Sequence, residues 1–249
     1  MAIRTISRRS VLATGAVLAA LAAALVWQNS VRRTPPREPV GLFTTLPILW
    51  AESGDVGDLV SSRAEPHWAR NVIGKAGPIV PLDDLAQPDR LAPLQRIVMA
   101  QPRPLSPSEN VALDRWVRGG GRLLLFADPM LTEDSAFALG DPRRPQTSVL
   151  LSPILGRWGL ELHYDERQPF GEHTGEALRI AVPVNLAGRF ALGPGSTCVL
   201  SDGGLAADCP IGKGRVLVLA DAALFERDGA GTARVEALDR LLETAFVRP

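Results

Sequence analysis

The sequence is poor in the residues on which covalent and metal chemistry usually depend. Its 249 residues include 2 cysteines and 3 histidines. No cysteine or serine stands in a Gly-x-Cys-x-Gly or Gly-x-Ser-x-Gly turn, so the common nucleophile motif is absent. The histidines, His67, His163 and His173, are too scattered to indicate a metal triad. We therefore predict no catalytic residue, no metal and no cofactor.

Lysine is almost absent as well, and with it the motifs that hold nucleotide phosphates. Lys213 lies in Gly212-Lys213-Gly214, but the spacing of a Walker motif is missing. A strand pattern follows these residues, whereas a phosphate loop is followed by a helix. Gly119-Gly120-Gly121 likewise precedes a strand, so these glycines indicate the end of a helix and not a dinucleotide fingerprint.

Charge is balanced overall but unevenly distributed along the chain. The sequence has 27 basic and 27 acidic residues, and six of the basic ones, all arginines, precede the first acidic residue, Glu38. The remainder therefore holds 21 basic residues against 27 acidic ones. A nucleic-acid partner requires a basic face for its phosphates, so this mildly acidic remainder predicts no nucleic-acid binding.

The N-terminal residues 1–28 have the features of a membrane anchor or an export signal. Residues 11–27 are uncharged and nearly long enough to cross the hydrocarbon core of a bilayer. One alternative is a retained transmembrane helix that anchors the protein in the inner membrane by a single pass. The other is a cleaved signal, because residues 7–12 resemble a twin-arginine export signal. Residues 29–39, rich in proline and arginine, predict an extended linker. Either alternative places residues 40–249 in the periplasm.

The clearest structural pattern is a strand–helix–strand unit. Residues 96–100 form a short apolar run that ends at Gln101, as expected of a buried strand. Residues 123–127 form a second such run, which is apolar on both faces and ends at Asp128. Two strands joined by a helix in this way lie parallel, with a right-handed crossover.

The helix between these strands has a predicted start, face and end. Ser106 is the predicted N-cap, because Glu109 stands three residues later and completes a capping box. The glycines at 119–121 predict its end. An apolar stripe is expected to face the sheet: Val111, Leu113, Trp116 and Val117. Charged residues are expected to face away from the sheet: Glu109, Asp114, Arg115 and Arg118.

The remaining patterns extend this unit into a three-layer α/β domain over residues 40–249. Further strands are predicted at residues 40–46, 79–82, 160–164 and 215–220. Helices are predicted at residues 67–74, 148–158 and 233–246. Short strands at 178–184, 189–192 and 197–201 indicate an antiparallel C-terminal addition, while residues 165–175 are expected to form an exposed loop. The predicted fold is a mostly parallel, flavodoxin-like sheet covered by helices.

Residues 105–129, LSPSENVALDRWVRGGGRLLLFADP, resemble the auxiliary soluble domain of ABC-type transport systems of the gliding-motility kind. Residues 151–162 and 212–221 match later segments of that family, and the resemblance covers residues 40–242 in order. It implies the fold of class I glutamine amidotransferases, in an extracytoplasmic domain beside ABC permease and ATPase subunits, without catalysis. An amidotransferase requires a cysteine on the turn that Asp128 occupies here, so the fold is expected without its nucleophile.

Four polar residues stand just after predicted strands: Thr45, Gln101, Asp128 and Asp221. In open α/β sheets, ligands bind outside the carboxyl ends of the strands, so these residues could line a ligand site. The alternative is that the two aspartates are turn or N-cap residues that satisfy backbone N–H groups. If the aspartates are buried and adjacent, one pKa should be raised, which would favour the ligand site.

The two cysteines, Cys198 and Cys209, flank Gly203-Gly204. If these glycines form a two-residue hairpin turn, the cysteines face each other across the ladder at a hydrogen-bonded pair. A disulfide between them is then possible in an oxidising compartment, and two buried thiols are the alternative.

These observations favour a non-catalytic, extracytoplasmic recognition or scaffolding component of an ABC-type transport system. The alternative is a small-ligand-binding protein, or a hydrolase-like enzyme, that uses Asp128 and Asp221 at the carboxyl edge of the sheet.

Overall fold

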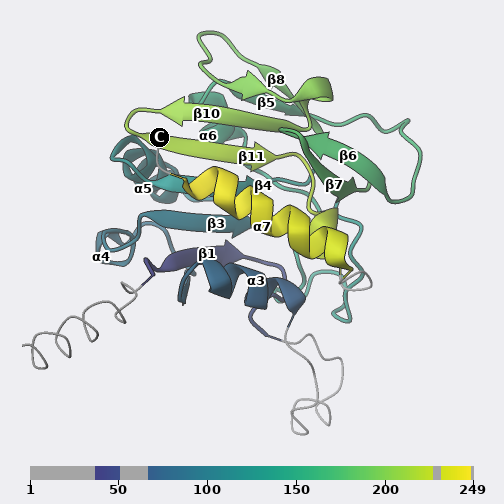
Figure 1. The fold of residues 1–249 in the computed structure, drawn as a ribbon, viewed down its shortest axis with the longest axis horizontal. Coiled ribbons are helices and arrows are strands. Elements are labelled where there is room, and N and C mark those ends of the chain that lie inside the picture. Colours follow the sequence, from purple (N-terminus) through teal and green to yellow (C-terminus); the bar gives the residue numbers. More distant parts are fainter. Residues whose placement is uncertain (1–36, 51–66, 227–230, 248–249) are drawn as a thin grey trace, which may run out of the picture. The chain divides into compact units, whose positions relative to one another are not determined.

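The computed structural model of the protein describes residues 37–50, 67–226 and 231–247 (Figure 1). The predicted membrane segment, residues 1–28, and most of the predicted linker, residues 29–39, lie outside the described residues. Within the described part of the chain, no helix is both long enough and apolar enough to cross a membrane.

A seven-stranded, mostly parallel sheet forms the centre of the fold, in the order β2-β1-β3-β4-β11-β10-β9. The strands that run parallel to one another are β1 (Val40–Thr44), β2 (Ile79–Pro81), β3 (Arg96–Ala100), β4 (Arg122–Phe126) and β11 (Gly214–Leu219). β10 (Ala206–Ile211) and β9 (Val199–Leu200) extend one edge in the antiparallel sense. The prediction of a mostly parallel α/β sheet with antiparallel additions is confirmed. The predicted parallel arrangement of β3 and β4 is also confirmed.

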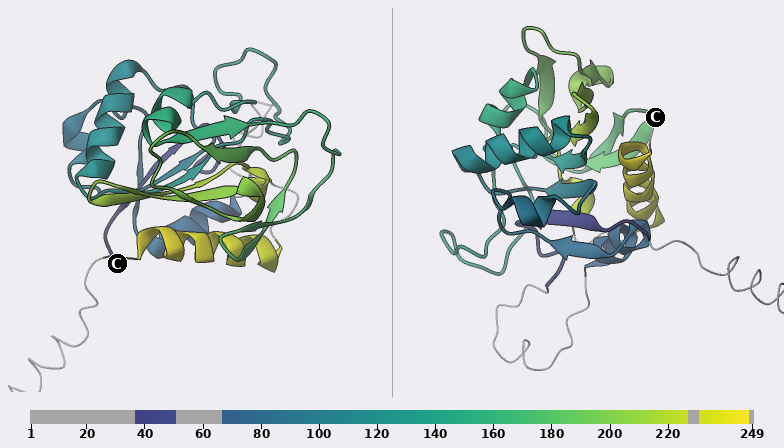
Figure 2. Two further views of the ribbon diagram at one scale, coloured as in Figure 1. Left: turned by 90° about the horizontal axis from the view of Figure 1, so that it is seen from above. Right: turned by 90° about the vertical axis from the view of Figure 1, so that its left-hand side faces the viewer.

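Helices cover both faces of the sheet (Figure 2). On one face, α3 (Trp68–Ala76) packs against α7 (Thr232–Phe246). The other face carries α4 (Pro88–Leu91), α5 (Pro107–Arg118) and α6 (Ser152–Arg157). β4 is apolar from Leu123 to Phe126 because its side chains enter two cores. Leu124 and Phe126 pack in the core under α3 and α7, whereas Leu123 and Leu125 pack in the core under α5 and α6.

The order of the strands reverses between β1 and β3. From β1 the chain passes through α3 to the edge strand β2. It then returns past β1 to β3 and continues through α5 to β4, with α3 and α5 on opposite faces. Ligands of open α/β sheets bind outside the carboxyl ends of the strands at such a reversal, so this edge is the place to look for a site.

Helix α5 confirms the predicted start and most of the predicted face, because Leu113 and Val117 are buried and Arg115 and Arg118 are exposed. The Ser106 hydroxyl accepts a hydrogen bond from the Glu109 N–H, and the Glu109 carboxylate accepts one from the Ser106 N–H. Val111, however, is 56% exposed, while Glu109 and Asp114 are buried. Because they are charged, Glu109 and Asp114 were predicted to face away from the sheet, but a buried carboxylate is stable when hydrogen-bond donors surround it. The donors to Asp114 are Arg118, Arg157 and the indole of Trp158.

The second half of the chain differs from the prediction at several places. The helix predicted at residues 148–158 begins only at Ser152, because the residues before it are bonded to the loop after β4. There the Val149 N–H donates to the Asp128 carbonyl (2.9 Å). The loop predicted at 165–175 gives way to a strand, β6 (His173–Ala177), which pairs with β7 (Ile180–Val184). Only Ala177 of β6 is buried, so no apolar alternation marks this strand in the sequence.

A separate antiparallel pair joins β5 (Leu160–His163) to β8 (Arg189–Leu192). The predicted antiparallel addition is confirmed for β7 and β8, which lie beside the parallel sheet (Figure 1). β5, predicted with the core strands, pairs with β8 instead, while the strand predicted at residues 197–201 joins the seven-stranded sheet as β9.

Candidate functional site

The four polar residues predicted at the carboxyl edge lie together in the structure. The Thr45 hydroxyl donates to the Gln101 carbonyl (2.5 Å). The Gln101 amide pairs with the backbone of Asp128, donating from Nε2 to the carbonyl (3.0 Å) and accepting at Oε1 from the N–H (3.0 Å). The last residues of β4 and β11 are register partners. Asp128 and Asp221, each two residues further on, therefore stand side by side.

Gln101 has a backbone conformation that most residues avoid. Its φ is 44°, in the left-handed region, and its side chain is fully buried. The second amide N–H donates to the Gln146 carbonyl (2.8 Å). Gln101 thus joins the ends of β3 and β4 to the loop at residues 131–147, and both of its amide N–H groups are used within the protein.

Each carboxylate oxygen of the two aspartates accepts a backbone N–H. Asp128 accepts from Met130 (2.8 Å) and Ala222 (3.0 Å), and Asp221 accepts from Ala223 (2.7 Å) and Asn185 (3.0 Å). The exposed fractions are 0% for Asp128 and 3% for Asp221. These contacts correspond to the backbone-capping alternative of the sequence analysis.

Burial raises the pKa of both aspartates. The pKa of Asp128 rises to about 7, through desolvation and, to a lesser extent, the charge of Glu226. Desolvation and the charge of Asp128 raise the pKa of Asp221 well above its ordinary value. The expected shift is thus present, but neither carboxyl is accessible to a ligand. Among the described residues, no group of three or more His, Cys, Asp or Glu side chains could hold a metal ion.

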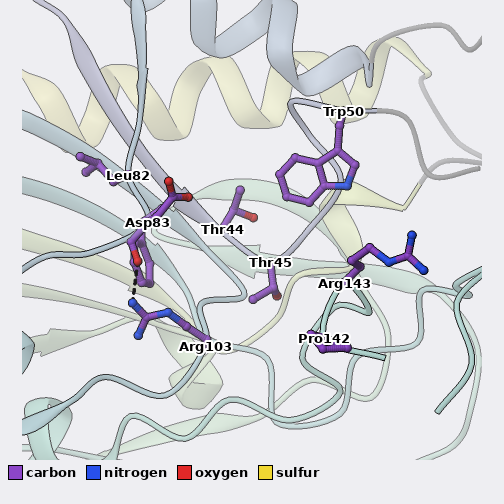
Figure 3. Close-up of a pocket in the computed structure, with 9 residues that line it drawn as sticks. Thr44, Thr45, Trp50, Leu82, Asp83, Arg103, Pro142 and Arg143 are labelled. Carbon is purple, nitrogen blue, oxygen red and sulfur yellow. Dashed lines mark hydrogen bonds between the residues drawn. The ribbon is translucent and has the colours of Figure 1, made fainter. Parts of the chain in front are cut away.

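A cleft of about 490 Å³ opens beside these residues, at the carboxyl ends of β1 and β2 (Figure 3). It lies at the reversal of strand order, between the loops that follow β1, β2, β3 and β4. Its lining consists of Phe43, Thr44, Thr45, Trp50, Leu82, Asp83, Arg103, Pro142 and Arg143. Of these, the sequence analysis identified only Thr45 as a site residue. The available signal was that Asp83 and Arg103 also follow strands within two or three residues.

The two arginines of the cleft are already paired with acids. Arg103 donates to both carboxylate oxygens of Glu109 (2.7 and 3.0 Å) and to the Asp83 carbonyl (2.6 Å). Burial tends to raise the pKa of Glu109, but hydrogen bonds, first of all from Arg103, lower it to about 2. Arg143 donates to Asp141 through Nε (3.0 Å) and Nη2 (2.8 Å).

The unpaired groups of the cleft are a carboxylate and an indole. The Asp83 carboxylate is exposed and makes no hydrogen bond or ion pair with any part of the chain that the structure describes. Trp50 is 44% exposed on the wall that it shares with Arg143, opposite Asp83 and Leu82 (Figure 3). A large aromatic face with an adjacent polar group is a common arrangement in small-ligand sites.

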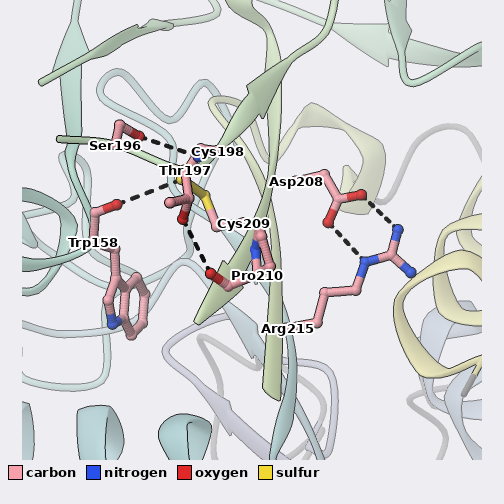
Figure 4. Close-up of a disulfide and its surroundings, with 8 residues drawn as sticks. All are labelled: Trp158, Ser196, Thr197, Cys198, Asp208, Cys209, Pro210 and Arg215. Atoms are coloured by element: carbon pink, nitrogen blue, oxygen red, sulfur yellow. Dashed lines mark hydrogen bonds and ion pairs between the residues drawn. A yellow bond between two sulfur atoms is a disulfide. The ribbon is translucent and has the colours of Figure 1, made fainter. Parts of the chain in front are cut away.

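Cys198 and Cys209 form a disulfide that joins the residue before β9 to the middle of β10 (Figure 4). The predicted register of this hairpin is confirmed, because Leu200 pairs with Ala207 and Val199 with Asp208. The same count places the two cysteines opposite each other. Their Cα atoms are 4.1 Å apart.

The turn of this hairpin is not the predicted two-residue turn. The Ser201 N–H donates to the Ala206 carbonyl (2.8 Å), which closes a longer loop through the 3₁₀ turn η1 (Asp202–Gly204). Because this bond makes Ser201 and Ala206 a hydrogen-bonded pair, the cysteines fall at a non-hydrogen-bonded pair, where strands approach more closely. The prediction of a hydrogen-bonded position was therefore wrong.

Comparison with known proteins identifies distant similarities of fold. No protein-family model matches the sequence, and no curated protein sequence matches it. One similar solved structure is Gan42B, a GH42 β-galactosidase from G. stearothermophilus (TM-score 0.47, 13% identity, 86% of this chain and 31% of that chain). A second is the exo-β-1,4-mannosidase Op5Man5 from Opitutaceae bacterium strain TAV5 (TM-score 0.45, 16% identity, 89% and 38%).

A third is a putative ThuA-like protein from Bacteroides uniformis (TM-score 0.44, 10% identity, 83% of this chain and 91% of that chain). The chain spans only about a third of the length of the two glycosidases. Similarities at this distance assign no activity to this chain.

Proposed function

We propose that this chain is a non-catalytic recognition domain of amidotransferase-like fold, held outside the cytoplasm as an auxiliary component of an ABC-type transport system. The observation that carries the non-catalytic part is the state of Asp128. This residue occupies the turn after β4, where a catalytic class I amidotransferase requires its cysteine nucleophile. Asp128 is fully buried there, and both of its carboxylate oxygens accept backbone N–H groups.

The extracytoplasmic part of the proposal is supported by the disulfide and by the apolar N-terminal residues. A bond between Cys198 and Cys209 persists in an oxidising compartment and is rare in the cytoplasm. Residues 11–27 supply an uncharged run suited to a membrane anchor or an export signal. The transport partner rests on the resemblance of residues 105–129 to the auxiliary domains of such systems.

Affinity purification of the full-length tagged chain from its native membranes tests the proposal. We expect extraction to require detergent and the eluate to contain an ATPase subunit and a permease subunit. A cleaved export signal would give a soluble periplasmic chain, which should still be cross-linked to those subunits in whole cells. A chain that is recovered without either subunit after cross-linking contradicts the proposed partner.

The second candidate function is binding of a small ligand, and the cleft at the carboxyl ends of β1 and β2 favours it. Its test is a screen for ligand-induced increases in melting temperature, followed by the variants Trp50→Ala and Asp83→Asn. Asp89→Asn, an exposed carboxylate of α4 outside the cleft, is the matched control. A shift that all three variants retain would show that the ligand does not bind in this cleft.

A further inference from the structure

The carboxyl pair Asp128 and Asp221 lies where several segments of the chain converge. The pair stands at the carboxyl ends of two neighbouring parallel strands, which are about 4.8 Å apart in a sheet. Both side chains are buried, so little water is available to screen one carboxyl from the other.

The pair holds three segments against the sheet. Asp128 accepts from Met130, at the start of the long loop after β4, and from Ala222 beyond β11. Asp221 accepts from Asn185, in the connection between β7 and β8, and from Ala223 in the 3₁₀ turn η2 (Ala223–Phe225). The side chain of Asn185 in turn accepts from the Gly171 N–H (3.0 Å), so the loop before β6 depends on the same pair.

The charged groups around the pair do not neutralise it. Glu226, just after η2, adds a further negative charge. Arg234 of α7 contacts Glu172 and the Ala223 carbonyl and lies 3.9 Å from Glu226. Among the described contacts, Arg234 therefore serves two other acids and makes no bond to either aspartate. His67, before α3, faces η2 through a hydrogen bond between its Nε2 and the Phe225 carbonyl (2.8 Å).

We infer that Asp128 and Asp221 share a proton and act as a pH-dependent latch, which holds the β7–β8 connection, η2 and the loop after β4 against the parallel sheet. With one proton on the pair, a single negative charge is stabilised by the backbone N–H groups of four residues. Without the proton, two like charges stand side by side in a site shielded from water. Local opening of the segments that cover them lets water reach the charges and lowers their repulsion.

Amide hydrogen exchange of the whole protein, measured by NMR between pH 5 and pH 9, tests this inference. Protection factors, corrected for the intrinsic effect of pH, are compared between the N–H groups held by the pair and those in the middle of β4 and β11. We expect the protection of Met130, Asn185, Ala222 and Ala223 to fall at least tenfold more than that of the strand amides as the pH rises. Equal pH dependence in the two sets would overturn the latch, because it would mean that ionisation destabilises the whole fold and not the segments that the pair holds.

Two variants separate proton sharing from simple capping. Asp221→Asn removes the second ionisable group, so two like charges can no longer form, and the fall in protection should become much smaller, leaving only the titration of Asp128, even if the variant is less stable. If that variant does not fold, Glu226→Gln provides a second test, since Glu226 makes no hydrogen bond to the pair among the described contacts but adds charge to it. Loss of this charge should move the midpoint of opening to lower pH. Glu236→Gln, an exposed position on α7, is the control and should leave the midpoint in place. A midpoint that does not move in Glu226→Gln contradicts the latch.

Discussion

Reduction of the disulfide between Cys198 and Cys209 should lower the free energy of unfolding by at most about 3 kcal/mol. The two residues are 11 apart in sequence, and closing a loop of that length in the unfolded chain removes about 9 cal/mol/K of entropy, or about 3 kcal/mol at 25 °C. The loss of packing is small, because both thiols stay buried as small apolar groups after reduction.

The position of the hairpin at the sheet edge determines whether the loss of stability is local or global. β9 is an edge strand of only two residues, and β10 is its neighbour in the sheet. Part of the loss should therefore be local separation of β9 from β10, which exchange detects but global unfolding does not. We expect the global loss to lie between about 1 and about 3 kcal/mol.

Urea unfolding, followed by circular dichroism with and without a reductant, measures the global loss. The variant with both Cys198→Ala and Cys209→Ala should be destabilised without reductant and should not respond to it, which controls for other effects of the reductant. An unchanged midpoint in the reduced protein would refute the reasoning, because it would mean that the β9–β10 hairpin does not take part in cooperative unfolding.

Three further results are expected. The pKa of Asp128 is about 7 in the folded chain and near 3.8 when unfolded, so the folded state binds the extra proton between these values. The free energy of unfolding from this group should therefore fall by about 3 kcal/mol from pH 4 to pH 7, as urea titrations at several pH values would show. An unfolding free energy that rises steadily over this range would contradict the shift. Asp114→Ala should cost about 2–3 kcal/mol in urea unfolding, because the buried N–H of Trp158 loses its acceptor; a loss under 0.5 kcal/mol would show that water replaces the carboxylate. Gly214→Ala would bring a Cβ within 2.0 Å of a carbonyl oxygen of α5, and we expect the free energy of unfolding to fall by more than about 3 kcal/mol. Gly74→Ala, with nothing within 4 Å of the added Cβ, should be neutral or stabilising, so similar melting temperatures for the two variants would refute this.

The features that the sequence predicted well are those in which local chemistry and burial agree. The strand–helix–strand unit carries a capping box at Ser106 and Glu109 and two apolar runs of strand length, and each of these signals is independent of the rest of the fold. The position of Gln101 and Asp128 at the end of their strands follows from the same pattern. The hairpin register followed from the positions of two glycines, although the turn itself differs.

The features that the sequence did not predict depend on partners distant along the chain. Asp114 is buried because Arg157 and Trp158, more than forty residues later, donate to it, and no pattern within α5 contains that information. Strand β6 has one buried residue, so it gives no apolar alternation. The cleft is made by the loops that follow β1, β2, β3 and β4, and these meet only when the strands are ordered in the sheet.

The carboxyl edge of the sheet therefore contains two sets of polar residues with different tasks. The residues directly after the strands use their hydrogen-bonding groups within the protein. Gln101 donates both amide N–H groups, and Asp128 and Asp221 each accept two backbone N–H groups. The groups in the cleft remain able to contact a ligand, since the carboxylate of Asp83 and the face of Trp50 are exposed. A ligand approaching this edge would meet Asp83 and Trp50, while the buried aspartates would affect it only through the stability of the segments that they hold. Substitutions in the first set should consequently change stability and its pH dependence, and substitutions in the second should change binding alone.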